Sequence, residues 1–256
     1  MSRKAYKTCD DRFRKIKIFQ VSKARFAPES CEKHNYLEQI YCKPIDFLQI
    51  VWYNTTIWRK SMIITTQQLK EYYSSLSDPK GRILRDVKNG KLFPLVKGIY
   101  ETDPNASGHN LAQFIYGPSY ISFDFVLHNR GLIPEAVYHT ITCATFNKRK
   151  IKTYKNRFGT FIYRDVPKEV FSLGVIAIMN GQYSYQVATP EKALCDKLYT
   201  ISPVTSVKEL KNLLFEDLRI DEDAFNKLNM EDILKMAPLY RSTNLNLLVK
   251  LIGEER

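Results

Sequence analysis

Six basic residues lie close together in the stretch 80–97 and could bind phosphate groups. They are Lys80, Arg82, Arg85, Lys88, Lys91 and Lys97. An ammonium or guanidinium group pairs with a phosphate oxygen, and arginine can also bind a guanine edge through two parallel hydrogen bonds. Such a cluster is typical of a surface that reads double-stranded DNA, although ordinary solvated helices carry basic residues too. Whether the cluster is a DNA-binding surface or an ordinary solvated one depends on the helices and strands that carry these side chains.

The residues just before this cluster predict a helix starting at about position 65. Thr65 or Thr66 can cap its first turn by accepting a backbone N–H bond. The apolar residues that follow have helical spacing and should form its inner face. They are Leu69, Tyr72, Tyr73 and Leu76.

A second helix is expected over about residues 79–89. Asp78 is a good N-cap, Pro79 suits the first helical position, and Asn89-Gly90 is a natural left-handed stop. The spacing places Ile83, Leu84 and Val87 on an inner face. Arg82 and Arg85 should then point away from the core, with Lys80 in the first turn and Lys88 at the flank. A helix with this outer face could enter a major groove.

The stretch GKLFPLVKGIY, at 90–100, predicts a short hairpin directly after the second helix. Residues 92–94 and 98–100 can pair around a turn, and Pro94 belongs at an edge because it cannot donate to a ladder. Two helices followed by a basic hairpin is the order of a winged helix-turn-helix. Lys91 and Lys97 would then lie where a wing meets the DNA backbone. The helix that usually precedes such a pair would have to come from residues 33–50, unless the domain is a minimal one.

The charge and cysteine content of the chain are consistent with a polyanion as partner and a reducing compartment. Of 256 residues, 39 are Lys or Arg and 27 are Asp or Glu, which gives a net charge of +12. The five cysteines form no C-x-x-C pair, and no apolar run approaches the roughly 20 residues of a membrane span. The protein is therefore expected in the cytoplasm, without a membrane partner.

Residues 1–61 are expected to be a basic N-terminal extension outside the native protein. They hold 13 basic and 6 acidic residues but show no sustained hydrophobic period. The sequence WRKSM, at 58–62, can be encoded by a purine-rich stretch just before the codon of Met62, which resembles a ribosome-binding site. Translation starting at Met62 is one reading, and a genuine basic arm is the other.

The segment 63–103 resembles the N-terminal winged helix of AbiEi-type antitoxins, which belong to type IV toxin–antitoxin (abortive infection) systems. The resemblance continues through YGPSYISFDFVLHNRGLIPE at 116–135, FNKRKIKTYKNRFGTFIYRDVP at 146–167 and VATPEKALCDKLY at 187–199. It implies a winged-helix domain over 62–103 and a C-terminal antitoxin domain over 104–256. It also implies repression of the protein's own promoter, and a nucleotidyltransferase toxin that is countered without a stable complex.

The pattern after residue 104 predicts an α+β fold with a mainly antiparallel sheet and a helical tail. Helices are expected at 107–116, with Leu111, Phe114 and Ile115 on one face, and after a cap at Ser119 or Ser122. Strands should follow at 137–146, in IKTYKN and GTFIYRDV, and in a hairpin with a turn at Asn180-Gly181. A helix begins at Pro190, and about three more occupy 206–251.

A basic run between the first strands could form a second nucleic-acid surface. It comprises Lys148, Arg149, Lys150, Lys152, Lys155 and Arg157. Tyr154 and Phe158 interleave with these cations and could stack on bases. The alternative is a solvated hairpin tip.

The sequence predicts no enzyme, cofactor or metal site. His139 and Cys143 are too few for a metal, and Cys195 reads as a core residue rather than a nucleophile. Glu191 and Asp196 are expected to cap or to face solvent, although with Asp124 they could suggest a metal-dependent nuclease. The leading hypothesis is therefore a DNA-binding antitoxin and autorepressor. The alternatives are a repressor without a toxin and a nuclease-like enzyme with a DNA-binding module.

Overall fold

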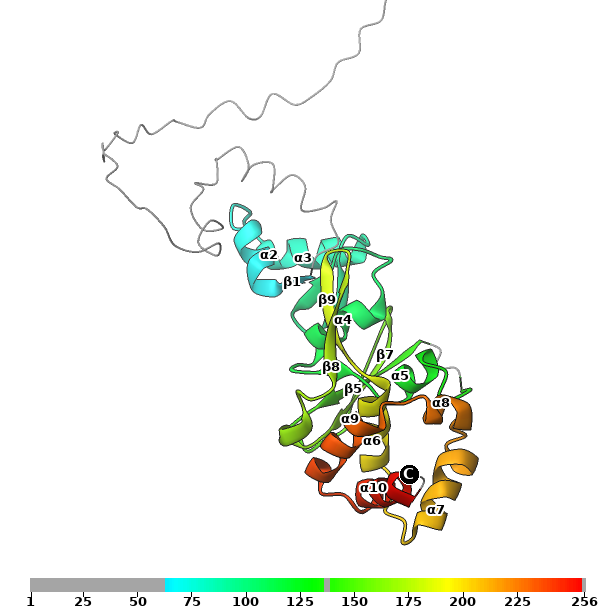
Figure 1. Ribbon diagram of the computed structural model, residues 1–256. Helices are drawn as coiled ribbons and strands as arrows, with labels where there is room; N and C mark the ends of the chain where they lie inside the picture. The colour runs from blue at the N-terminus through cyan, green and yellow to red at the C-terminus, as the bar shows by residue number, and fades with distance from the viewer. Residues whose placement is uncertain (1–62, 136–138, 255–256) are drawn as a thin grey trace, which may run out of the picture. The chain divides into compact units, whose positions relative to one another are not determined.

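The computed structural model describes residues 63–135 and 139–254, which fold as a mixed α+β structure (Figure 1). The predictions made for the extension at 1–61, for a start at Met62 and for a helix within 33–50 fall outside these residues, as do the first two residues of the strand expected at 137–146. None of the described helices has both the length and the apolar character needed to cross a membrane.

Residues 63–103, called the N-terminal module below, contain two helices and a three-stranded sheet. In chain order its elements are β1 (Ile63–Thr65), α2 (Thr66–Tyr72), α3 (Pro79–Lys88), β2 (Phe93–Val96) and β3 (Ile99–Glu101). β1 and β2 both pair antiparallel with β3, so the sheet order is β1-β3-β2. The two helices and the hairpin expected from the sequence are confirmed.

Local side-chain chemistry explains where both helices begin and end. Thr65 caps α2 and forms a capping box with Gln68. The carboxylate of Asp78 accepts a hydrogen bond from Gly81 N, with Pro79 in the first turn of α3. α3 stops at Asn89, and Gly90 has a φ of 67°, a conformation that glycine adopts without steric cost.

The N-terminal module has a small core of its own. Its buried members are Ile64, Leu69, Tyr73, Ile83 and Leu92. Leu76 lies beyond the end of α2 and is exposed, because the helix ends one turn earlier than the apolar spacing predicted.

The rest of the described chain, called the C-terminal domain below, is built on a six-stranded sheet of order β6-β7-β5-β4-β9-β8. Its strands are β4 (Tyr120–Ile121), β5 (Thr140–Thr145), β6 (Lys152–Asn156), β7 (Gly159–Asp165), β8 (Val175–Asn180) and β9 (Tyr183–Ala188). β4 runs parallel to β9 and β5 runs parallel to β7, while the other three pairs are antiparallel. Three of the five pairs are thus antiparallel, as predicted, and the two parallel pairs make the sheet a mixed one.

Helices precede the sheet, connect its strands and follow it. They are α4 (Gly108–Ile115), α5 (Asp124–Asn129), η3 (Lys168–Val170), α6 (Pro190–Tyr199), α7 (Val207–Asn212), η4 (Leu213–Asp217), α8 (Glu222–Asn226), α9 (Met230–Met236), η5 (Ala237–Tyr240) and α10 (Thr243–Glu254). α6 contacts α5, α9 and α10, and Figure 1 shows α6, α9 and α10 gathered together.

Three local predictions for the C-terminal domain are wrong. Neither Ser119 nor Ser122 caps α5, whose N-cap is Phe123 without a side-chain bond. Phe114 is exposed, although Leu111 and Ile115 are buried as expected. Asn180 pairs with Tyr183, so the turn residues are Gly181 and Gln182 rather than Asn180 and Gly181. Positive φ occurs at Gly181 and not at Gln182, as in a type II′ turn.

Candidate nucleic-acid interface

The outer face of α3 carries three of the predicted DNA-facing cations in exposed positions. Lys80, Arg85 and Lys88 are all exposed. Leu84 is also exposed, by 68%, although the sequence placed it on the inner face. Arg85 approaches Asp78 at 3.9 Å, a loose pair between two largely exposed side chains. The outer face of α3 is therefore basic with one apolar side chain among the cations.

The inner face of α3 holds a carboxylate that the sequence did not single out. Asp86 is 1% exposed and accepts hydrogen bonds from the hydroxyl of Tyr73 at 2.7 Å and from Nε of Arg82 at 3.1 Å. Its backbone oxygen accepts from the N–H groups of Lys91 and Leu92. Asp86 thus ties α3 to α2 and to the chain that enters the hairpin.

The prediction that Arg82 points away from the core is wrong. Its guanidinium forms an ion pair with the buried Asp86 and lies 5.7 Å from the centre of the Tyr73 ring. Asp86 raises the pKa of Arg82. Burial, together with the bond to Asp86, raises the pKa of Tyr73 to about 12, so its hydroxyl remains a donor at neutral pH. Arg82 therefore positions α3, and Lys80, Arg85 and Lys88 remain as its outward cations.

The hairpin places Lys91 and Lys97 at opposite ends of β2, and both side chains are exposed. Lys97 lies in the tight turn between β2 and β3, next to Gly98, whose φ is 88°. The carbonyl of Gly98 accepts from both the N–H and the hydroxyl of Thr66, which fixes the turn against the start of α2. Lys91 meets Arg82 at a cavity of about 370 Å³, which Tyr72, Tyr73 and Thr102 also line.

Five of the six cations in the second basic run are exposed, and two of the six have aromatic neighbours. Arg149, Lys150, Lys152, Lys155 and Arg157 are exposed, and Lys148 is partly buried. Lys148 lies over the Tyr116 ring at 5.1 Å, and Arg157 over the Phe93 ring at 4.2 Å.

The two rings of this run have partners within the protein. Tyr154 packs against Tyr116 and Tyr163, and Phe158 packs against Phe93. Because both rings are at least half covered, their main role is in the core, while the cations of β6 form an exposed basic edge.

Three kinds of contact join the N-terminal module to the C-terminal domain. The hydroxyl of Tyr183, on β9, donates to the fully buried Glu101 of β3 at 2.7 Å. The side-chain amide of Asn156 donates to the carbonyl of Leu95 at 3.1 Å. Arg157 and Phe158 cover the ring of Phe93. The module is therefore held against the sheet by polar as well as apolar contacts.

The TPEKALCD segment, at 189–196, forms the start of α6 and a buried polar network. Thr189 caps the helix, and Glu191 accepts from the N–H of Asn229 at the start of α9. Lys192 and Asp196 are both 0% exposed and lie 3.2 Å apart. The prediction that Glu191 and Asp196 cap or face solvent is therefore wrong, because both are buried while Thr189 caps α6 and Asn229 caps α9.

Every polar atom of the Lys192–Asp196 pair has a close partner. Lys192 donates to the carbonyl of Val170 and to the hydroxyl of Tyr240. Asp196 accepts from the hydroxyls of Tyr240, Tyr120 and Ser122 at 2.6, 2.9 and 2.7 Å. Burial lowers the pKa of Lys192, and the adjacent Asp196 opposes that effect. Because both side chains are buried and all their polar atoms are hydrogen-bonded, the pair suits a structural role, and none of its atoms faces a substrate.

The thiols and the candidate metal ligands lie in similarly closed surroundings. Cys143 and Cys195 are fully buried, and burial raises the pKa of both thiols, which disfavours the reactive thiolate. His139 is exposed and precedes β5, on which Cys143 is buried, so the two side chains share no open site. No group of three His, Cys, Asp or Glu residues in the described ranges could hold a metal ion.

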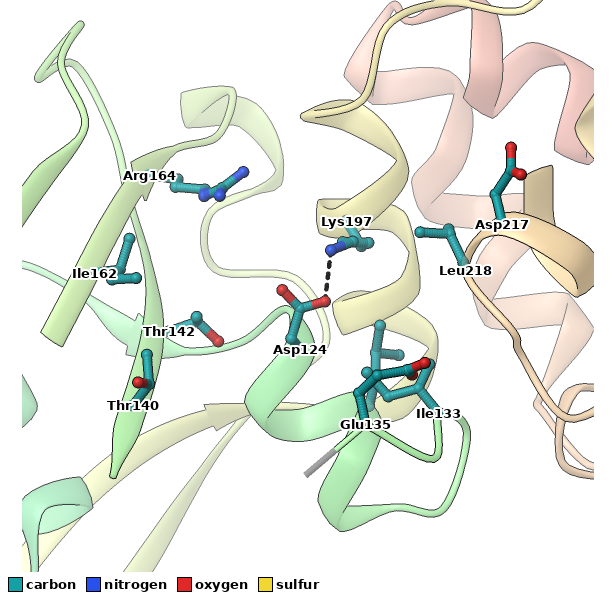
Figure 2. Close-up of a pocket in the computed structure, with 11 residues that line it drawn as sticks. Asp124, Ile133, Glu135, Thr140, Thr142, Ile162, Arg164, Lys197, Asp217 and Leu218 are labelled. Atoms are coloured by element: carbon teal, nitrogen blue, oxygen red, sulfur yellow. Dashed lines mark hydrogen bonds and ion pairs between the residues drawn. The ribbon is translucent and has the colours of Figure 1, made fainter. Parts of the chain in front are cut away.

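A larger cavity of about 640 Å³ lies between the sheet and α6 (Figure 2). Thr140, Thr142, Ile162 and Arg164 line it from the sheet, and Lys197 lines it from α6. Lys197 forms an ion pair with Asp124 at 2.5 Å, and Glu135 pairs with Arg219. The lining holds three carboxylates, those of Asp124, Glu135 and Asp217, and two cations, and the adjacent Arg219 balances Glu135. The cavity therefore has no net preference for an anion such as phosphate.

No protein-family model matches the chain, and no curated protein matches it significantly.

The sequence did not predict the positions of Asp86 and Leu84, the two residues that define which face of α3 is outward. The one available signal was the tyrosine at position 73, since a buried tyrosine hydroxyl requires a partner.

Proposed function

We propose that this protein is a winged helix-turn-helix repressor that binds double-stranded DNA in its own promoter. We further propose that it serves as the AbiEi-type antitoxin of a nucleotidyltransferase toxin. The observation that carries the first proposal is the outer face of α3. Lys80, Arg85 and Lys88 project from a helix whose inner face is fixed to α2 by Asp86. The basic hairpin with Lys97 at its turn follows directly.

The proposed mechanism assigns separate tasks to the charged and the apolar side chains. Lysines at the ends of α3 and on the hairpin contact phosphates, and these contacts supply affinity without sequence preference. Arg85 reads a guanine edge, and the exposed Leu84 contacts a thymine methyl group in the major groove. Occupancy of the promoter, in the cytoplasm where that DNA lies, then blocks transcription.

Fluorescence-anisotropy binding to the duplex upstream of the protein's own gene tests the first proposal. The full chain should bind this duplex more tightly than a scrambled one, with a steep salt dependence. Arg85→Ala should weaken specific binding by about 1–3 kcal/mol. Lys208→Ala, an exposed lysine on α7, is the matched control and should change affinity only slightly. Equal binding to both duplexes, or equal effects of both substitutions, would remove α3 from the interface.

Co-expression tests the proposed antitoxin role. A nucleotidyltransferase gene is expected beside the protein's own gene, and its expression alone should arrest growth. Co-expression of the full chain should restore growth, while affinity purification of either protein should not retain the other. Failure to restore growth, with promoter binding intact, would leave a repressor without a toxin.

A further inference from the structure

The two edge strands of the six-stranded sheet differ in charge. β6, at one edge, carries the exposed Lys152 and Lys155. β8, at the other, belongs to a hairpin in which no residue from 175 to 188 is charged, although charged residues make up 26% of the chain. Ile176 and Met179 on β8 are 42% and 74% exposed. Charged side chains on an edge strand prevent another strand from adding to it, and β8 has none.

The geometry of the hairpin shows which backbone groups of β8 are unpaired. The two-residue turn places Asn180 opposite Tyr183. The pair that closes a turn of this length is hydrogen-bonded, and bonded pairs alternate along an antiparallel ladder. The N–H and C=O groups of Val175, Ala177 and Met179 therefore point away from β9. In the described part of the chain, no other strand pairs with that side of β8.

We propose that β8 is the interface with a second copy of this chain, which adds antiparallel across a two-fold axis at Ala177. In this register Ala177 lies opposite Ala177 of the second copy, and Val175 lies opposite its Met179. Ile176 then faces Ile178 across a non-hydrogen-bonded pair. All of these cross-strand pairs are apolar, and each outward backbone group finds a partner. The two edges would join into a continuous twelve-stranded sheet, made of two six-stranded halves.

Charge argues for a second copy at this edge. Each chain carries a net charge of +12, so most faces of two copies repel one another. An uncharged strand lets backbones approach without placing like charges in contact. The interface is small, because six residues of one strand bury less surface than a standard protein interface. The dimer should therefore be weak and its population should depend on concentration.

Charge substitution at Ala177 tests both the interface and its register. Sedimentation velocity of the full chain from about 1 to about 200 µM should show a monomer that converts to a dimer. Ala177→Lys and Ala177→Glu should each abolish the dimer, because the new charge faces its own copy. An equimolar mixture of the two variants should dimerise again. Circular dichroism of each variant checks that the fold is retained.

A strictly monomeric wild-type chain would overturn the proposal, as would an Ala177→Lys variant that dimerises like the wild type. Failure of the mixture to dimerise would overturn the register.

Cysteine cross-linking gives an independent test, in a chain whose Cys9, Cys31 and Cys42 are changed to serine. Ala177→Cys should form a disulfide-linked dimer on mild oxidation, since directly opposite Cα atoms lie within bridging distance. Thr153→Cys, on the lysine-bearing edge strand, is the control; equal cross-linking of both would count against β8.

Discussion

The N-terminal module and the C-terminal domain each contain a carboxylate that is almost fully buried, and the two are stabilised differently. Asp86 in α3 is 1% exposed, but its cationic partner Arg82 has a side chain that is 42% exposed. Asp196 in α6 is 0% exposed, and so is its partner Lys192. Water therefore reaches the cation of the first pair and not that of the second.

This difference follows from the size of the two cores. The N-terminal module has five buried apolar residues in its own cluster, which is too few to enclose an ion pair completely. Its helices are instead oriented by Asp86, which contacts α2, α3 and the start of the hairpin. In the C-terminal domain, a much larger apolar core includes the buried Ala193, Leu194, Cys195 and Leu198 of α6. The orientation of α3, which carries the proposed DNA-facing surface, thus depends on the hydrogen bonds of Asp86, called the polar junction below. The stability of the C-terminal domain depends on its apolar core.

Removing the cation of the enclosed pair should have the largest effect. Lys192→Met keeps the length of the side chain but leaves the charge of Asp196 buried, which should lower the free energy of unfolding by about 3–5 kcal/mol. Urea unfolding of the full chain measures this. Lys197→Met breaks the neighbouring, partly exposed pair with Asp124 and should cost about 1 kcal/mol or less. Equal costs would show that enclosure does not distinguish the two pairs.

Removing a donor from the polar junction should have a smaller effect on stability. Tyr73→Phe leaves Asp86 with one hydrogen bond fewer and should cost about 1–3 kcal/mol. It should also weaken promoter binding, since α3 loses a contact that orients it. Tyr100→Phe is the control, because in the described structure the Tyr100 hydroxyl has no hydrogen bond and its ring packs on the same cluster.

The raised pKa of Tyr73 stabilises the fold at pH values below the unfolded pKa of 10.0, and this stability is lost as the pH rises toward about 12. The cost of Tyr73→Phe should therefore be constant between about pH 6 and pH 9; a change across that range would contradict it.

Local signals predicted the elements of the N-terminal module, and long-range partners decided the orientation of its side chains. Asp78, Pro79 and Gly90 mark the ends of α3 through contacts within a few residues, so the sequence was sufficient there. Leu84 was assigned to the wrong face, and the buried Asp86 was not singled out. The hydroxyl that holds Asp86 inward belongs to Tyr73, on another helix, and helical periodicity ranks an aspartate as outward.

The same limit applies to the C-terminal domain. In the sequence, the charged residues of α6 look like a solvated helix face: Glu191, Lys192 and Asp196. Asp196 is nevertheless buried, because it bonds to tyrosines that are 44 and 76 residues away in sequence. The parallel pairs β4–β9 and β5–β7 likewise join strands that are not consecutive. The β8–β9 hairpin was predictable because it is a local element, although its turn lies one residue later than predicted.

Glu101, a buried carboxylate of β3, bonds to the C-terminal domain and allows the connection between the two regions to be tested. Its Oε2 accepts from the Tyr183 hydroxyl, and its Oε1 accepts from the N–H groups of Thr102 and Asp103. Glu101→Gln retains an oxygen for the backbone donors but offers Tyr183 an amide that cannot accept.

A double-mutant cycle of Glu101→Gln with Tyr183→Phe should therefore show coupling. Each single change should cost about 1 kcal/mol, and the double change should cost less than the sum by about 0.5 kcal/mol or more. Urea unfolding of the four proteins measures the cycle. Additivity within about 0.3 kcal/mol would mean that this bond does not couple the regions. The contacts of Phe93 with Arg157 and Phe158 would then carry the connection.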